Sequence, residues 1–208
     1  PWTAWLAGLC IVAGAIWGIA FGPEDYQQAD SVRIMYVHVP SAWMALFVYV
    51  CLAGASFSAL VWRHPLAHLF LALVTGALWG KPMWGAWWVW DARLTSVLVL
   101  FFFYLGHIAL TRAFDDAQRG ANAAAILALV GVVNVPIVKF SVDWWSTLHQ
   151  GSSIARISGP SIDISMLVPL LLMILGFTLY FVTLVFLRTR SEIAAARIRA
   201  LNLRRAHG

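Results

Sequence analysis

Six stretches of the sequence are long and apolar, and they constrain the fold more than any other feature. They run over residues 2–21, 41–62, 66–78, 94–111, 121–138 and 166–187. A helix needs ~20 apolar residues to cross the ~30 Å hydrocarbon core of a bilayer, and lipid cannot satisfy the backbone of an open strand. Only 11% of the residues are charged, against roughly 25% in a soluble domain. We therefore expect an all-α polytopic membrane protein with six transmembrane helices.

The third stretch, residues 66–78, is shorter than the others. At ~1.5 Å per residue it covers only about 20 Å, which is too short for an unaided span. Two explanations stay open. Either the tryptophan-rich segment that follows completes the span, or the sequence lacks residues near His68–Phe70.

The basic residues favour one orientation in the membrane. On the side of the C-terminus, the loops and the tail contain nine arginines: 63, 112, 119, 188, 190, 197, 199, 204 and 205. The opposite side has five basic residues: Arg33, Lys81, Arg93, Lys139 and Arg156. Because cytoplasmic loops carry the excess of Lys and Arg, we expect both termini in the cytoplasm, with residues 188–208 as a basic cytoplasmic tail. The segment 79–93 and the loop 139–165 then lie on the outer face.

The outer segment 79–93 contains an unusual concentration of indole rings. Five of the thirteen residues from Trp79 to Asp91 are tryptophans: Trp79, Trp84, Trp87, Trp88 and Trp90. We expect Gly80, Pro82 and Gly85 to break regular structure, and helical spacing to begin at Trp84. Indole has a flat polarisable face and one N–H donor, so the run predicts a platform for a flat ligand. The alternative is an aromatic belt at a membrane interface, although belts scatter their aromatic residues.

Two of the six histidines, His38 and His149, lie in outer segments near this platform. Pro40 suits the first turn of a helix, so we expect His38 just before the helix that begins near Ser41. The positive end of that helix would keep its imidazole neutral. His149 is expected to end a short helix that begins near Asp143, so that Trp145 shares its face. The two imidazoles together suggest a pair of metal ligands.

Two neutral imidazoles beside a group of indoles match the requirements of non-covalently bound, b-type haem. Its iron takes axial ligands, and its macrocycle takes flat apolar contacts. We predict His38 and His149 as axial ligands of the iron. The propionates need cationic partners, for which the candidates are Lys81, Arg93, Arg33 and Arg156. Asp91 either contacts the ligand or caps the helix that follows it.

The sequence offers little for other chemistry. It contains no P-loop, HExxH or GxSxG motif and no nucleic-acid-binding module. We therefore expect a protein that binds and passes on haem, not an enzyme. Two alternatives remain. A permease subunit for haem or another small molecule would need a polar path through the spans, and an integral b-type electron-transfer cytochrome would need histidine pairs inside them.

Three segments closely resemble the haem exporter protein C family of the multi-component bacterial cytochrome c maturation system. They are His38-Val-Pro-Ser-Ala-Trp43, the run from Trp79 to Thr95, and Asp143-Trp-Trp-Ser-Thr-Leu-His149-Gln-Gly-Ser152. The tryptophan run is similar to the periplasmic "WWD" domain of that family. The similarity extends from the first span to at least His149. Members of the family have a longer segment than Arg63–Gly80 between the second and third spans.

The resemblance implies a location, a ligand and a set of partners. It implies six spans in the bacterial inner membrane, with haem held at the periplasmic side and axial histidines that map onto His38 and His149. It also implies that haem is passed to a membrane-anchored periplasmic haem chaperone, with the help of a small single-span subunit. A second membrane subunit and an ABC-type ATPase of the same system would then release the loaded chaperone.

Overall fold

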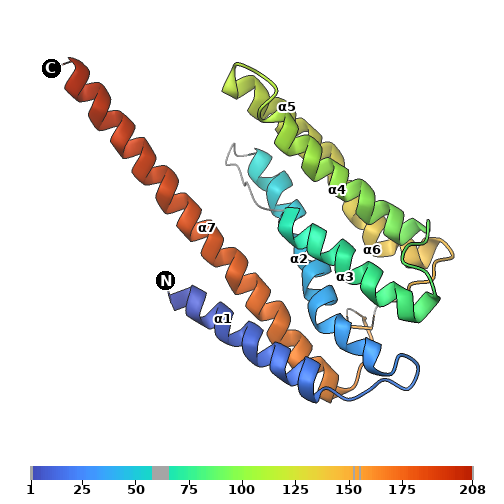
Figure 1. The fold of residues 1–208 in the computed structure, drawn as a ribbon. Coiled ribbons are helices and arrows are strands. Elements are labelled where there is room, and N and C mark those ends of the chain that lie inside the picture. Colours follow the sequence, from blue (N-terminus) through green and yellow to red (C-terminus); the bar gives the residue numbers. More distant parts are fainter. Residues whose placement is uncertain (1, 58–65, 152, 155, 208) are drawn as a thin grey trace.

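The computed structural model describes residues 2–57, 66–151, 153–154 and 156–207, and these form an all-α membrane protein (Figure 1). Along the chain, the elements are α1 (Trp2–Ala15), the short π-helix η1 (Ile16–Ala20), the 3-10 helix η2 (Asp30–Ile34), α2 (Met35–Phe57), α3 (Leu66–Trp84), α4 (Ala92–Leu110), α5 (Ala117–Gly131), α6 (Asn134–Trp144) and α7 (Ile164–His207).

Five helical segments of this described part are long and apolar enough to cross a membrane. They are Trp2–Ala20, Asp30–Ala53, Ala92–Leu110, Ala117–Trp144 and Ile164–Arg205. α3 has 19 residues, but its last two turns carry Trp79, Lys81 and Pro82 and are less apolar. These findings confirm the prediction of an all-α polytopic membrane protein. Many large apolar side chains on α1, α4, α5 and α7 are exposed in the isolated chain, as helices surrounded by lipid require.

α2 lies at the centre of the bundle. The side of α2 that carries Met44 packs against α7, and the side that carries Tyr49 packs against α4 and α5. The rings of Tyr49 and Tyr104 meet edge to face with centroids 4.9 Å apart. The Tyr104 hydroxyl donates to the Ala45 carbonyl at 2.9 Å. These contacts fix α2, which carries His38, against its neighbours on both sides.

The two ends of the bundle carry different segments. In Figure 1, both termini and the turn between α4 and α5 lie toward the upper left, whereas the loop after η1, the end of α3 and the start of α4 lie toward the lower right. The outer segments predicted from the sequence therefore gather at one end. Which end faces the cytoplasm stays a prediction.

One predicted helix start and one predicted helix end differ from the structure. In both cases the cause is a proline, which a helix tolerates near its start. α2 begins at Met35, six residues before the predicted start at Ser41, with Pro40 inside the helix. His38 is therefore part of α2 and does not precede it. Likewise, Pro136 is the third residue of α6, where its missing N–H is not needed. The helix continues to Trp144, so the loop begins at residue 145 and not at 139. The predicted end of the second span at residue 62 lies outside the described residues, as does the turn 63–65.

α3 continues into the first part of the tryptophan segment. α3 runs without a break from Leu66 to Trp84, six residues beyond the predicted end at Leu78. Its 19 residues correspond to a length of about 28 Å, which is close to the ~30 Å of the hydrocarbon core. α3 is not among the five segments that are long and apolar enough to cross a membrane, so completion of the third span by the tryptophan segment stays a prediction.

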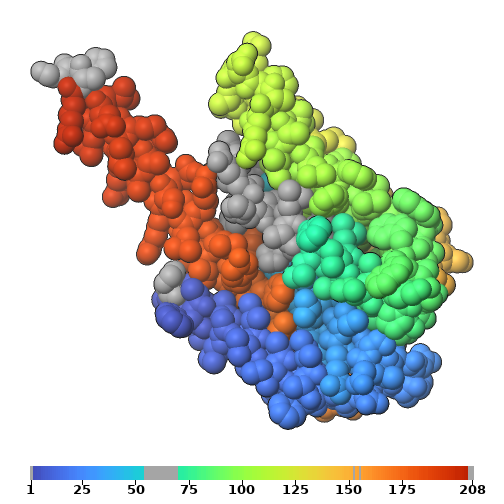
Figure 2. All heavy atoms as spheres, viewed as in Figure 1, coloured from blue at the N-terminus to red at the C-terminus, as the bar shows by residue number. Residues whose placement is uncertain are grey.

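The basic tail is a direct continuation of the last span. α7 has 44 residues, which corresponds to roughly 66 Å and is twice the thickness of the hydrocarbon core. In Figure 2, its C-terminal half stands apart from the rest of the molecule. The tail is helical as far as His207, but it extends the span instead of forming a separate helix.

The α1–α7 pair depends on small residues at the contact. A methyl group on Gly176 of α7 would lie 2.6 Å from Cγ1 of Ile11 and 2.9 Å from its backbone nitrogen. Close approach of backbones at small residues is a common way for helices to associate in membranes.

We expect Gly176→Ala to lower the thermal unfolding temperature of the detergent-solubilised protein. Overpacking costs ~1–3 kcal/mol, which exceeds the ~0.5–1 kcal/mol that alanine gains over glycine in a helix. Gly8→Ala on α1 is the matched control, because a methyl group there meets nothing within 4 Å. Equal unfolding temperatures for the two variants would contradict close α1–α7 packing.

Candidate functional site

The tryptophan run is divided between the end of α3 and an irregular segment. α3 ends at Trp84, and Gly85 then has φ +74°, a conformation that glycine adopts without strain. The Gly85 N–H donates to the Lys81 carbonyl at 3.0 Å and closes the last turn of α3. The prediction of a helix that begins at Trp84 is therefore wrong. The helix ends there because Gly85 terminates it, and residues 85–91 have no regular structure.

Asp91 begins the next helix. Its backbone is extended, and its Oδ1 accepts a hydrogen bond from the Leu94 N–H at 2.7 Å, so it caps α4. An aspartate in this position satisfies a backbone donor that the first turn of the helix leaves unpaired. The cap predicted as one of two roles for Asp91 is confirmed.

The side chain of His38, which belongs to α2, lies between α2 and α3. Its Nδ1 is 3.2 Å from the Thr75 hydroxyl, and its ring meets the Trp79 indole edge to face with centroids 5.4 Å apart. A methyl group on Gly76 would lie 3.0 Å from the imidazole Cε1, so the glycine gives the ring its place against α3. The Trp79 indole N–H in turn donates to Oε1 of Gln28 at 2.8 Å.

The Thr75 contact determines which nitrogen of His38 carries the proton. The Thr75 hydroxyl donates its own hydrogen to the Leu71 carbonyl at 2.6 Å. It can therefore only accept from His38, whose Nδ1 must be the donor. In a neutral imidazole the other nitrogen, Nε2, then carries a free lone pair. This is the form of histidine that binds a metal through Nε2.

His149 lies in the loop after α6, not in a helix. α6 ends at Trp144, and Trp145 is already extended. The Thr147 hydroxyl accepts from the His149 N–H at 3.2 Å, a local bond that competes with helix formation. The predicted short helix over Asp143–Gln150 is therefore wrong, and Trp145 does not share a helix face with His149. The ring partner of His149 is Trp84, with centroids 4.8 Å apart.

The imidazole of His149 is uncharged in this environment. Burial, followed by the positive charge of Arg93 and the proximity of His38, lowers its pKa to about 3. Nδ1 of His149 is 3.9 Å from Oδ2 of Asp91. Since the ring is neutral above that pKa, we treat this contact as one between a carboxylate and a neutral imidazole and not as an ion pair.

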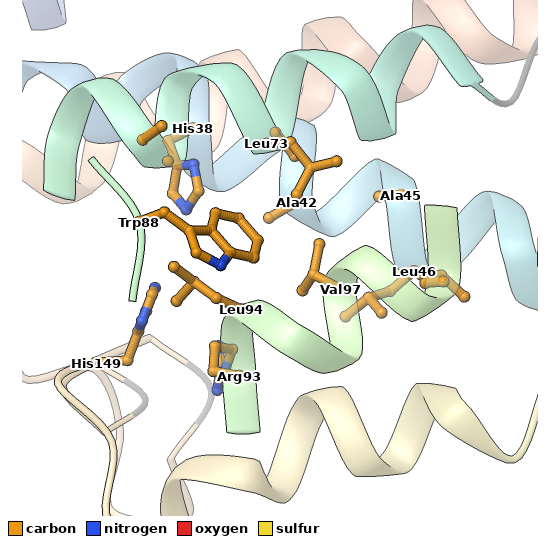
Figure 3. Close-up of a pocket in the computed structure, with 14 residues that line it drawn as sticks. His38, Ala42, Ala45, Leu46, Leu73, Trp88, Arg93, Leu94, Val97 and His149 are labelled. Carbon is orange, nitrogen blue, oxygen red and sulfur yellow. The ribbon is translucent and has the colours of Figure 1, made fainter. Parts of the chain in front are cut away.

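His38, Gly76 and His149 line two adjoining cavities. The inner cavity, of about 560 Å³, lies between α2, α3 and α4 and is lined mainly by apolar residues, together with Trp88 and Arg93. The outer cavity, of about 450 Å³, lies beside Trp79, Trp84 and Gln28. Figure 3 shows His38 and His149 reaching the inner cavity from opposite sides, with the Trp88 indole near its centre. The two histidines therefore stand where the cavities meet.

Arg93 and Trp88 supply polar donors to the inner cavity. The Arg93 guanidinium donates to the Ser141 hydroxyl at 3.2 Å and to the Lys139 carbonyl at 3.3 Å, so α6 holds it in place. The indole N–H of Trp88 is buried and has no hydrogen-bond partner among the described residues. A buried donor without a partner is rare in native proteins, and its position in the wall of a cavity is what a ligand acceptor would satisfy.

The structure gathers most of the predicted site residues, but not all of them. Trp87 and Trp90 are 56% and 76% exposed and line neither cavity. Lys81 also lies outside both linings, and its amino group donates to the Gly85 carbonyl at 2.9 Å and lies over the Trp87 ring. Arg33 pairs with Asp30 and with the end of η1, and Arg156 is exposed.

Sequence reasoning missed Gln28, Thr75 and Gly76. The signal for the last two was present, because Thr75, Trp79 and Met83 recur at helical spacing and Gly76 is next to them. It went unused because the helix was expected to end at Leu78. Gln28 carries no local signal, since only the fold of the loop after η1 brings it to Trp79.

The donor set suits a ligand that needs two imidazoles. In the part of the chain that the structure describes, no group of three or more His, Cys, Asp or Glu side chains is arranged to hold a metal ion. A structural zinc site needs four such ligands. Haem needs one or two, because its porphyrin supplies the other four nitrogens. Two imidazoles, an apolar cavity and the unpaired N–H donor of Trp88 fit haem better than a bare metal ion.

The chain is similar to known proteins of one family. The family model described as "Heme exporter protein C" matches residues 1–204. The "Heme exporter protein C" of Bradyrhizobium diazoefficiens is 52% identical over 219 positions, covering 99% of this chain and 83% of that protein. Its counterpart in Escherichia coli K12 is 50% identical over 93% of this chain and 83% of its own length. A Marchantia polymorpha protein named "Putative cytochrome c biosynthesis ccmC-like mitochondrial protein" is 47% identical over 90% of this chain.

The first of these alignments is longer than the 208 residues of this chain, so the Bradyrhizobium protein has residues that have no counterpart here. Such a difference does not affect the assignment, because the matched region includes all of the residues that form the two cavities. The chain belongs to the heme exporter protein C family.

Proposed function

We propose that this protein binds haem non-covalently between His38 and His149 and hands it to a periplasmic haem chaperone. The observation that carries the proposal is the position of the two imidazoles. They come from α2 and from the loop after α6, far apart in the sequence, yet both line the same two cavities. The names of the relatives, which refer to haem export and cytochrome c biosynthesis, support this ligand.

Each part of the site matches a part of haem. When bound, the haem iron supplies two axial positions, which the imidazoles of His38 and His149 would occupy. The indoles of Trp79, Trp84 and Trp88 offer flat apolar contact to the macrocycle. The Trp88 N–H and the Arg93 guanidinium are donors suited to a propionate. The chain's own role is to bind, orient and release.

The location of the site suits the transfer of haem to a partner better than it suits electron transfer. It opens at the end of the bundle, beside a loop, whereas a b-type cytochrome would carry its histidines between helices deep in the membrane. His107, which is buried within α4, has its Nδ1 bonded to the Ala124 carbonyl at 3.0 Å and lines neither cavity. A site at the membrane surface leaves an edge of the haem within reach of a partner.

The partners and the orientation complete the proposal. We infer that the end with the two cavities faces the periplasm, because the arginine-rich end of α7 and the turn between α4 and α5, which has Arg112 and Arg119 in or next to it, lie at the opposite end. Both termini are then cytoplasmic. The membrane-anchored chaperone would approach from the periplasm, next to the exposed Trp87 and Trp90. A small single-span subunit, a second membrane subunit and an ABC-type ATPase would complete the assembly.

Loss of both histidines is the first test. We expect His38→Ala and His149→Ala each to weaken haem binding by roughly tenfold or more, which corresponds to ~1.4 kcal/mol for each lost ligand. The double variant should purify without haem, as measured by its Soret absorbance. His207→Ala, at the far end of α7, is the matched control. Full haem retention in the double variant would rule out axial ligation by these residues.

Substitution of a tryptophan that lines a cavity should lower haem affinity more than substitution of an exposed tryptophan. Trp84→Leu is expected to lower haem affinity, because the indole lines the outer cavity and packs against His149. Trp87→Leu is expected to leave affinity nearly unchanged, because that indole is exposed and lines neither cavity. Titration of haem into the purified variants measures the difference. Equal losses in the two variants would show that the cavity walls do not define the site.

A further inference from the structure

The two oxygens of Asp91 have different surroundings. Oδ1 caps α4 through the Leu94 N–H. Oδ2 points the other way and lies 3.9 Å from Nδ1 of His149. The Asp91 side chain is only 6% exposed, and neither Oδ2 nor His149 Nδ1 has a hydrogen-bond partner among the described residues. A buried acceptor therefore faces a buried nitrogen across slightly more than hydrogen-bonding distance.

At His38, Nδ1 likewise faces an acceptor, and here the two atoms are within hydrogen-bonding distance. Nδ1 of His38 is 3.2 Å from the Thr75 hydroxyl, which can only accept because it donates to the Leu71 carbonyl. Each of the two histidines thus presents Nδ1 to an acceptor on a neighbouring element. The acceptor for His38 is on α3, and the acceptor for His149 is at the start of α4.

We propose that Asp91 is the positioning residue for His149, and that Asp91 and Thr75 hold the two imidazoles in the same tautomer, with the proton on Nδ1 and the lone pair of Nε2 directed to the haem iron. This inference rests on the proposed function for its ligand, but the tautomer of the haem-free protein does not depend on that function. Asp91 then has two roles, and each uses one oxygen.

The chemistry of metal-bound histidine explains why such a partner is needed. Histidines that bind a metal usually donate their other N–H to a carboxylate or carbonyl, which fixes the ring orientation and makes the ligand more basic. The gap of 3.9 Å closes to a hydrogen bond of about 2.8 Å with a shift of roughly 1 Å. Binding of Nε2 to a haem iron would hold the ring in place and would favour that closure.

Asp91→Asn separates the two roles. Asparagine caps a helix as well as aspartate does, so its oxygen can keep the bond from Leu94. Its NH₂ group would then face His149. Because an amide NH₂ only donates, Nδ1 would become the acceptor and the proton would move to Nε2, the nitrogen that should bind iron. Asp91→Ser keeps a cap but removes the second oxygen, so it leaves Nδ1 of His149 without a fixed partner.

The first measurement uses the haem-free protein. In the full chain labelled with ¹⁵N-histidine and held in detergent, the ¹⁵N shifts of His149 distinguish a protonated from an unprotonated Nδ1. We expect a protonated Nδ1 in the wild type, a protonated Nε2 in Asp91→Asn and a mixture in Asp91→Ser. An unchanged His149 tautomer in Asp91→Asn would overturn the proposal, whether or not the protein binds haem.

The second measurement uses haem. We expect Asp91→Asn to lower haem affinity by about 10–100-fold, the usual effect of losing such a partner, and to shift the reduction potential of the haem that remains. The unfolding temperature of the haem-free variant should stay near that of the wild type, because the cap is kept. A wild-type protein with the expected tautomer but no haem affinity would contradict the proposed function alone.

Two further variants serve as controls. Asp116 caps α5 through the Gln118 N–H at 2.8 Å and lies at the other end of α4, so Asp116→Asn should change neither the tautomer nor the affinity. Thr75→Val should release Nδ1 of His38, and Thr75→Ser should restore the wild-type tautomer. If Asp116→Asn and Asp91→Asn have the same effect on haem affinity, Asp91 acts only as a helix cap.

Discussion

The cap at Asp91 is the interaction on which the site depends. A membrane helix must satisfy its own backbone, so a chain that leaves helical structure at Gly85 has to re-enter it with a donor satisfied at the first turn. Asp91 provides this through the Leu94 N–H. Asp91 also ends the irregular segment 85–91, whose Trp88 lines the inner cavity, and its second oxygen lies 3.9 Å from Nδ1 of His149. A single side chain therefore both begins α4 and faces the imidazole of His149.

The bundle provides a rigid frame around this segment. α2 is packed on both sides, against α7 through Met44 and against α4 and α5 through Tyr49. His38 therefore stands on a fixed helix, with its place against α3 provided by Gly76. His149 belongs to a loop whose contacts in the site are with Trp84 and Asp91. In the proposed function, one haem ligand would stand on a fixed helix and the other on a loop, an arrangement that suits release.

The class of fold and the Asp91 cap could be predicted because both depend on features that act over short distances, and the sequence also pointed to the two histidines that line both cavities. Apolar runs of about 20 residues indicate spans directly, and the Asp91 cap has a local signature. The errors arose where a proline or glycine was given the wrong role. Pro40 predicts a helix start near Ser41, but it is the sixth residue of α2. Pro136 lies near the predicted end of the fifth span, but it is the third residue of α6. Gly85 and not Gly80 ends α3. Contacts such as Gln28 with Trp79 could not be predicted, since only tertiary structure brings them together.

The central claim is that His38 and His149 share one haem through their Nε2 atoms. An experimental structure of the full chain loaded with haem tests it most directly. We expect the iron between the two imidazoles, with Nε2 of each at coordination distance and Nδ1 of each directed at Thr75 and Asp91. Haem bound away from the two cavities, or iron held by neither histidine, would contradict the account.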